Sequence, residues 1–283
     1  MTWKVLRALR NPPGNDALYW HIVTGDWSAP PPYHTSSFGC SITWLVIAAL
    51  LYLSMCGRGA LSIGIITLFS VVAGSAHGLI AAYQISRKIT EIKARRVYDF
   101  LCLSPSGECR VNWALCAGCL HRYNAFRLMF MFVMIAAVFT SFHLLSIVLR
   151  RVDWTAGEAD MVLLSMTAVP LLLVADYAQS LVIAALLGIL APTSTNNSTE
   201  ARLVAVAGFL TLQTGAYTLW LLLASASAQA ANAAYGEAVV LTIASAIAVV
   251  IIRELVVAAL LHVLARRFDG LPQEWNAEVP FKT

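Results

Sequence analysis

The sequence predicts an all-α integral membrane protein with six transmembrane helices. The first observation is composition, because 59% of the 283 residues are hydrophobic and 12% are charged, with a mean hydropathy of +0.72. Soluble domains carry about 25% charged residues. The second observation is length, because a helix needs about 20 apolar residues to cross a hydrocarbon core of about 30 Å. Runs of this kind cover residues 39–56, 60–86, 125–149, 161–191, 202–228 and 236–265.

The segment before the first run, residues 1–37, lacks the apolar core of a signal peptide. It contains the polar and proline-rich stretches NPPGND and SAPPPYH, so we expect no cleavable signal peptide. The stretch VLRALR predicts a short amphipathic helix on the lipid surface, with Trp3 at the headgroup level. Lys4, Arg7 and Arg10 would then face anionic lipid. A solvated basic tail is the alternative.

The distribution of lysine and arginine predicts the orientation. Six crossings place both termini on one side of the membrane. Apart from Arg253 inside the sixth run, only Arg58, Arg150 and Arg151 fall on the opposite side. By the positive-inside rule, both termini and the loop 87–124 are cytoplasmic, in a plasma (inner) membrane. The net charge of +4 then reflects membrane topology, and we expect no nucleic-acid partner.

This topology leaves little protein outside the lipid bilayer. Residues 1–37 form a cytoplasmic or interfacial segment, 38–265 the six-span domain and 266–283 a cytoplasmic tail. The outer loops are too short to form a receptor or an enzyme domain. The sequence also contains no G-x-x-x-x-G-K-(S/T), no Gly-x-Ser-x-Gly and no His-rich cluster. We therefore expect neither catalysis nor a cofactor.

The longest polar interval, 87–124, begins with an amphipathic stretch. From Ile85 the sequence ISRKITEIKARRVYDFLCLSPSG first alternates apolar and basic residues. It then gathers large apolar side chains, namely Val97, Phe100, Leu101 and Leu103. Pro105 and Gly107 turn the chain back toward the third run. The pattern predicts an interfacial helix on the cytoplasmic leaflet.

The same stretch resembles the cytoplasmic loop between the second and third helices in membrane subunits of the type 2 ABC exporters. In that family the loop has Ile-Ser, then charges, then Tyr/Leu-Asp-Leu-Leu-x-Leu-(Ser/Thr)-Pro. The matching residues of this chain are Ile89, Thr90, Tyr98, Asp99, Phe100, Leu101, Leu103, Ser104 and Pro105. The family's loop carries the coupling helix, which docks on a separate ATP-hydrolysing subunit.

The resemblance implies a permease-like membrane subunit that exports a substrate with energy from a separate ATP-binding cassette subunit. The residues that would contact that subunit are Tyr98, Asp99, Phe100, Leu101, Leu103, Ser104 and Pro105. Six helices form half of a pathway in this family. The resemblance therefore also implies a homo- or heterodimer of membrane subunits.

A second group of residues in the interval 87–124 raises the question of a metal site. Its members are Cys102, Cys109, Cys116, Cys119 and His121. Two thiolates separated by two residues, as in Cys-Ala-Gly-Cys, are half of many zinc or iron–sulfur sites. The other spacings fit no standard four-ligand signature. We expect free cysteines that pack as small apolar residues, with metal ligation as the alternative.

Ionisable residues inside the spans form the last candidate site. A charge at the middle of a bilayer costs at least about 2.5 kcal/mol, so it is usually paired or functional. Asp176 lies near the middle of the fourth run, Arg253 and Glu254 near the middle of the sixth, and His77 at a similar depth in the second. We expect an Asp176–Arg253 ion pair whose remaining donors are satisfied by Glu254 and Gln179. A polar layer that lines a substrate or proton path is the alternative.

Two functions other than an exporter subunit stay open. The chain could be a structural or accessory subunit of a larger respiratory or photosynthetic membrane complex, with the basic loop as an assembly surface. It could also be a secondary transporter that uses Asp176, Glu254 and His77.

Overall fold

The computed structural model describes residues 1–11, 17–24, 59–95, 97–103, 107–131, 134, 156–195, 197–230 and 235–268. Every secondary-structure element in these ranges is a helix, which confirms the predicted all-helical class. The first predicted span, 39–56, and most of the third, 125–149, lie outside the described residues.

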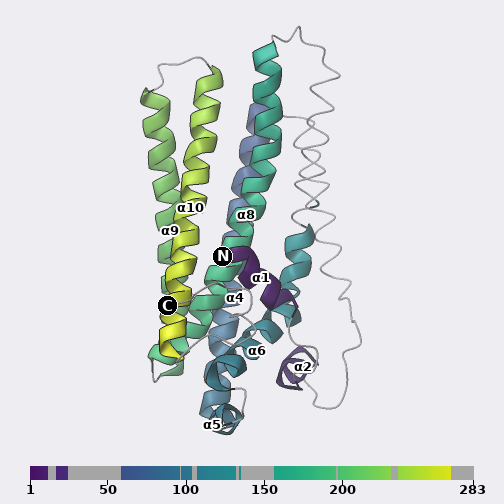
Figure 1. Cartoon of the computed structure of the whole chain (residues 1–283), viewed down its shortest axis with the longest axis vertical. Coiled ribbons are helices and arrows are strands. Elements are labelled where there is room, and N and C mark those ends of the chain that lie inside the picture. The colour runs from purple at the N-terminus through teal and green to yellow at the C-terminus, as the bar shows by residue number, and fades with distance from the viewer. Residues whose placement is uncertain are drawn as a thin grey trace.

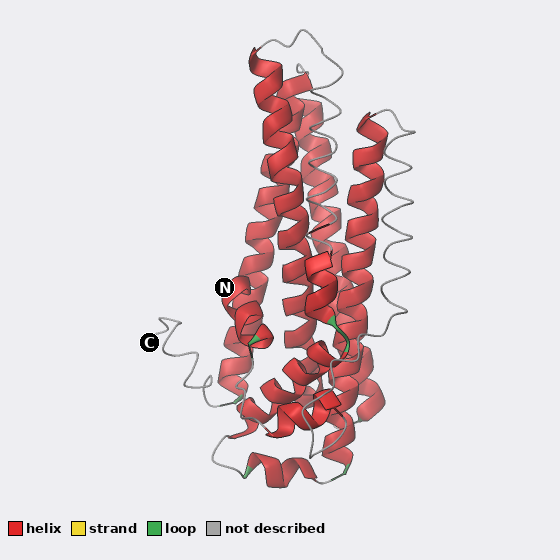
Figure 2. Cartoon of the chain, turned by 90° about the vertical axis from the view of Figure 1, so that its right-hand side faces the viewer, coloured by secondary structure: helices red, strands yellow, loops and turns green. Residues whose placement is uncertain are grey.

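Four long helices form the body of the molecule (Figures 1 and 2). They are α4 (Gly59–Ala94), α8 (Ala156–Ser194), α9 (Ser198–Ala230) and α10 (Tyr235–Arg267). Helix α8 packs on the other three, and α9 also contacts α4 and α10. At a rise of about 1.5 Å per residue, even the shortest of them is about 50 Å long, which exceeds the thickness of a hydrocarbon core.

Three of these helices are long and apolar enough to cross a membrane, within the ranges that the structure describes. The spans are Thr167–Ser194, Ser198–Ala226 and Val240–Arg267, in α8, α9 and α10. They agree with the fourth, fifth and sixth predicted spans, and the chain is a membrane protein. The second predicted span, 60–86, is helical throughout in α4, but the side chains of 60–70 and of Ala73 lie outside the described residues.

Shorter helices form a layer at one end of the bundle, which we call the basal layer. It consists of α2 (Ala17–Thr24), α5 (Val97–Cys102) and α6 (Gly107–Arg122), while α1 (Thr2–Arg10) runs beside the bundle from Glu254 of α10 to His121 of α6. All residues from Val111 to Leu120 of α6 are buried, because α6 packs against α1, α2, α4, α5 and α8. The interval predicted as a cytoplasmic loop, 87–124, is therefore mostly helical, and its second half is part of the core.

The amphipathic stretch after Ile85 is divided between two helices, contrary to the single interfacial helix expected. Helix α4 continues to Ala94 because Ile85 and Ile89 extend its buried face beyond the predicted span. Helix α5 then begins at Val97 as a separate short element. Gly107, with a φ of +70°, starts α6 in a backbone conformation that favours glycine.

The amphipathic helix predicted at the N-terminus is present as α1. Its apolar side, formed by Thr2, Val5, Leu6 and Leu9, is buried. Its other side exposes Trp3, Lys4, Arg7 and Arg10. The buried side contacts α6 and α8, so protein covers it rather than lipid.

Cations from neighbouring helices cap the basal end of α8. Lys93 of α4 donates a hydrogen bond to the Pro192 carbonyl at 3.0 Å. Arg267 of α10 donates to the Thr193 carbonyl at 2.8 Å. The last carbonyl groups of a helix lack partners within the helix and carry its partial negative charge. These two contacts therefore hold the basal ends of α4, α8 and α10 together.

Helices α4 and α9 approach closely at Gly78. A Cβ atom at this position would overlap the ring of Phe209, and the Phe209 side chain is fully buried. Small residues allow such approach between membrane helices. The packing of Phe209 therefore depends on the absence of a side chain at Gly78.

We expect Gly78→Val to destabilise the protein by about 1–3 kcal/mol, because the buried Phe209 ring has to move. Gly215→Val on α9 is the matched control, since open space surrounds that position. The measurement is thermal unfolding in detergent by fluorescence-detected gel filtration. Equal losses in the two variants would contradict close packing at Gly78.

Candidate functional site

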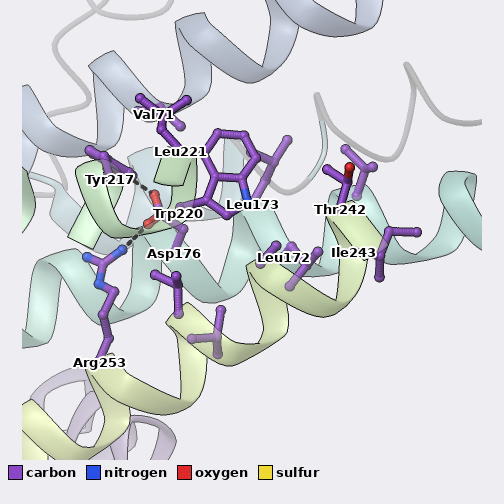
Figure 3. Close-up of a pocket in the computed structure, with 14 residues that line it drawn as sticks. Val71, Leu172, Leu173, Asp176, Tyr217, Trp220, Leu221, Thr242, Ile243 and Arg253 are labelled. Carbon is purple, nitrogen blue, oxygen red and sulfur yellow. Dashed lines mark hydrogen bonds and ion pairs between the residues drawn. The ribbon is translucent and has the colours of Figure 1, made fainter. Parts of the chain in front are cut away.

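An ion pair joins α8 and α10 in the middle of the bundle (Figure 3). Arg253 Nη1 donates to Asp176 Oδ1, and the two side chains are 4% and 17% exposed. The sequence predicts this pair, and the structure contains it. A buried charge that keeps its partner avoids the large cost of an unpaired one.

Polar groups from two further helices complete the hydrogen bonds of this pair. Arg253 Nη2 donates to Ser180 Oγ at 2.7 Å and to Gln213 Oε1 at 2.8 Å. Tyr217 donates its hydroxyl proton to Asp176 Oδ2 at 3.0 Å. We call the ion pair, the residues bonded to it and Ser75, which bonds to Gln213, the polar network.

The polar network reaches all four long helices. The amide nitrogen of Gln213 lies 2.6 Å from the Tyr217 hydroxyl and 3.0 Å from Ser75 Oγ of α4. Ser180, Gln213 and Arg253 each lie at the middle of their candidate span. The network therefore satisfies a guanidinium and a carboxylate at the depth where unpaired charge costs most.

The partners predicted for the ion pair, Gln179 and Glu254, lie outside the polar network. Gln179 donates to the Val250 carbonyl at 2.9 Å. Glu254 Oε2 accepts a hydrogen bond from the Thr2 backbone N–H and lies near the Met1 nitrogen, both at 3.1 Å. Consecutive positions on a helix point about 100° apart, and here Arg253 faces α8 and α9 whereas Glu254 faces α1. Ser180 and Gln213, instead of Gln179 and Glu254, accept the remaining hydrogen bonds of the Arg253 guanidinium.

His77 contacts Tyr177 instead of the ion pair, with His77 Nδ1 2.9 Å from the Tyr177 hydroxyl. His77, Asp176 and Glu254 thus have three separate sets of partners. The structure does not bring together the group expected for a secondary transporter.

Sequence reasoning missed Ser75, Ser180, Gln213 and Tyr217. Uncharged polar side chains occur at many positions in membrane helices, so none of them is conspicuous alone. A signal does exist in their spacing. Asp176 and Ser180, and likewise Gln213 and Tyr217, are four residues apart and so lie on one helix face.

A cavity of about 630 Å³ extends from the ion pair between α8, α9 and α10, with Val71 of α4 on one wall. Asp176, Tyr217 and Arg253 form its polar end (Figure 3). The rest of the lining is almost entirely apolar, namely Val71, Val169, Leu172, Leu173, Trp220, Leu221, Thr242, Ile243, Ala246, Val249 and Val250. The cavity has the size of a small-molecule site, for which about 300–1,000 Å³ is usual.

Helix α5 lies at the basal extreme of the molecule and is fixed there by Tyr98 (Figure 1). The Tyr98 hydroxyl donates to Glu108 Oε1 at 2.7 Å and accepts a hydrogen bond from Asn112 Nδ2 at 2.6 Å. Lys93 Nζ lies 4.8 Å from the centre of the Tyr98 ring. Burial and the bond to Glu108 raise the pKa of Tyr98 well above its usual range, so the hydroxyl stays a donor.

The residues predicted to contact a partner fall into a buried group and an exposed group. Tyr98 is buried and Leu101 packs against the core. Phe100 and Leu103, by contrast, are 76% and 81% exposed, and Asp99 is exposed beside them. The two remaining members of the predicted set, Ser104 and Pro105, lie outside the described residues.

The cysteines of the basal layer contribute to its packing. Cys116 and Cys119 are buried in α6, whereas Cys102 and Cys109 are half-buried. Among the described residues, no group of three or more His, Cys, Asp or Glu side chains is placed to hold a metal ion. His121 Nε2 lies 3.3 Å from the Leu9 carbonyl, so this ring joins α6 to α1.

Burial keeps these thiols protonated. It raises the pKa of Cys109 to about 11 and that of Cys119 to about 12. Burial likewise raises the pKa of Cys116 and lowers the pKa of the His121 imidazole. Only thiolates react rapidly with alkylating agents.

In the folded protein, iodoacetamide at neutral pH should therefore not label the tryptic peptide 111–122, which holds Cys116 and Cys119. Labelling should begin only when a denaturing detergent unfolds the protein. The peptide 97–110, with Cys102 and Cys109, should be labelled slowly. Because the pKa of Cys109 is about 11, its labelling rate should rise about tenfold per pH unit up to that value. Mass spectrometry of both peptides measures this. Rapid labelling of 111–122 in the folded protein would show that α6 is not buried.

Arg253→Ala should destabilise the protein by about 3–5 kcal/mol, because Asp176 is left buried without its cation. Adding Asp176→Ala should restore part of this loss. Thr214→Ala is the control, since that hydroxyl bonds carbonyl groups of its own helix. A double-mutant cycle by thermal unfolding gives the coupling free energy. Strictly additive losses would contradict an ion pair that acts as a unit.

No known family model, curated protein or solved structure matches this chain. Its function must therefore be inferred from the exposed side chains of α5, the polar network and the cavity.

Proposed function

We propose that this chain is a permease-like membrane subunit of an exporter that resembles the type 2 ABC family. A separate ATP-binding cassette subunit docks on α5 and supplies the energy, and two membrane subunits pair to form the pathway. The observation that carries the proposal is the pair of exposed apolar side chains, Phe100 on α5 and Leu103 directly after it, which lie beside the anchor of Tyr98.

The chemistry of α5 favours a protein partner. Large apolar side chains held in water are unfavourable, by about 25 cal/mol for each Å² exposed. Aromatic and aliphatic anchors that enter a pocket supply much of the affinity of protein interfaces. Phe100 and Leu103 fit this role, and the neighbouring carboxylate of Asp99 adds a polar contact at the rim.

The anchor of α5 also supports a mechanical role. Tyr98 bonds to Glu108 and Asn112 of α6, while its ring meets Lys93 of α4. A displacement of α5 would therefore be passed to two helices that contact α8. Helix α4 runs without interruption from this anchor to Ser75 in the polar network, about 27 Å away along the helix. ATP-driven movement at α5 would reach the polar network by this route.

The positive charge of the basal end supports the proposed orientation in an inner membrane, with both termini cytoplasmic. Arg95, Arg266 and Arg267 lie at the basal ends of α4 and α10, and Arg7 and Arg10 lie on the exposed side of α1. Lysine and arginine near span ends favour the cytoplasmic side. The docking helix α5 then lies in the compartment that contains ATP.

Replacing Phe100 and Leu103 together by Asp should lower co-purification of an ATP-binding cassette subunit at least tenfold, because the apolar anchors are lost. The measurement is purification from the native membrane in a mild detergent, followed by mass spectrometry and a vanadate-sensitive ATPase assay. Membrane insertion should be unchanged, since both side chains are exposed. Leu101 is left intact because it packs against the core.

The conservative pair Phe100→Leu and Leu103→Met is the matched control and should retain the ATPase. Undiminished ATPase in the Asp variant would contradict docking on α5. Wild-type protein that brings down redox or light-harvesting subunits, and no ATPase, would instead make the chain an accessory component of another complex.

A further inference from the structure

We propose that the cavity beside the polar network binds an uncharged amphiphile from the bilayer, with one alkyl chain and a hydroxyl or carbonyl headgroup. The alkyl chain lies along α10, and the headgroup oxygen accepts a hydrogen bond from Trp220 Nε1. The claim that this amphiphile is the transported substrate rests on the proposed function, whereas the claim that the cavity binds it does not.

The shape and lining of the cavity suit an alkyl chain. Along α10 the lining runs from Thr242 to Arg253, which is about 16 Å of helix. The lining side chains between these two ends are all apolar, namely Ile243, Ala246, Val249 and Val250. A long apolar site of this kind favours a flexible hydrocarbon chain over a polar solute.

Charge balance at the polar end excludes an acidic headgroup. The guanidinium of Arg253 is already bonded to Asp176, Ser180 and Gln213. Tyr217 gives its hydroxyl proton to Asp176. A carboxylate or phosphate would find no free cation and would lie close to the Asp176 charge. The ligand that fits is therefore neutral.

Trp220 supplies the hydrogen bond that a neutral headgroup needs. It projects from α9 among the lining side chains (Figure 3), and its indole nitrogen is buried without a hydrogen-bond partner among the described residues. A buried N–H that lacks an acceptor costs about 1–3 kcal/mol. An oxygen atom of a ligand would remove that cost.

The bilayer is the source of such a ligand. Leu221 lines the cavity and is 60% exposed, so the cavity reaches the surface of the bundle at that point. It lies within the membrane spans of α8, α9 and α10. A molecule that dissolves in the hydrocarbon core can therefore enter sideways, without passing through water.

Photo-crosslinking of the full chain in lipid nanodiscs tests this. The probe is a long-chain primary alcohol with a diazirine in the chain, and its comparison is the fatty acid with the same chain. The alcohol should label peptides of α8 and α10 that line the cavity, in a manner that excess unlabelled alcohol competes. The acid should give at least fivefold less competed labelling. Equal competed labelling by both probes, or labelling that no competitor reduces, would overturn the assignment.

Two variants locate the ligand. Trp220→Phe should weaken the competed labelling about fivefold, as expected for one lost hydrogen bond. Ala246→Phe fills the cavity and should abolish it, while Ala244→Phe, at an exposed position of the same helix that does not line the cavity, should leave it unchanged. Full labelling of the Ala246→Phe protein would place the ligand elsewhere. Thermal unfolding of each variant shows that it is folded.

The result is separable from the proposed function. Competed labelling without a co-purified ATPase would keep the ligand site and reject the exporter. A co-purified ATPase without competed labelling would reject the ligand site and leave the exporter in place.

Discussion

The charge of Arg253 has to be neutralised in the middle of a membrane span, and the arrangement of the four long helices depends on how this is done. One carboxylate, Asp176, balances the charge but leaves other N–H groups of the guanidinium unbonded. Ser180 and Gln213 accept from them, which brings α8 and α9 into a defined register against α10. Ser75 extends the same set of hydrogen bonds to α4. Apolar residues of similar volume can match a buried ion pair in stability, so the contribution we infer for this network is the register of the helices.

Two other features are positioned by that register. The cavity lies between α8, α9 and α10, and part of the network forms its polar end. Helices α4 and α8 also contact the basal layer, where α6 is enclosed by α1, α2, α4, α5 and α8. The anchor of Tyr98 then presents Phe100 and Leu103 outward. The proposed ligand site in the bundle and the proposed docking helix at its base are thus connected by continuous helices, the arrangement that a transporter driven from outside the membrane requires.

Much of the helical organisation could be predicted from the sequence, because apolar length alone specifies a span. The fourth, fifth and sixth spans follow from that rule. The amphipathic α1 follows from its pattern of apolar and basic residues, and the Asp176–Arg253 pair follows from two opposite charges at one depth of the membrane. The rest depends on side-chain direction. The direction of a side chain turns by about 100° with each residue of a helix. This rotation decides whether Glu254 faces the partners of Arg253 or α1. It also decides whether Leu101 or Leu103 faces outward. Composition carries no information on that rotation. The burial of α6 was missed for a related reason, because its polar flanks, Glu108 and Arg122, made a core helix resemble a surface loop.

The central claim is that α5 contacts an ATP-hydrolysing partner. The most direct measurement places a photoreactive phenylalanine analogue at position 103, where the side chain is exposed, and irradiates native membranes. The account predicts one dominant crosslinked product, whose second component is an ATP-binding cassette subunit, and no such product from position 101, which packs against the core. Crosslinks from position 103 to lipid alone, or to a protein without an ATP-binding domain, would contradict it.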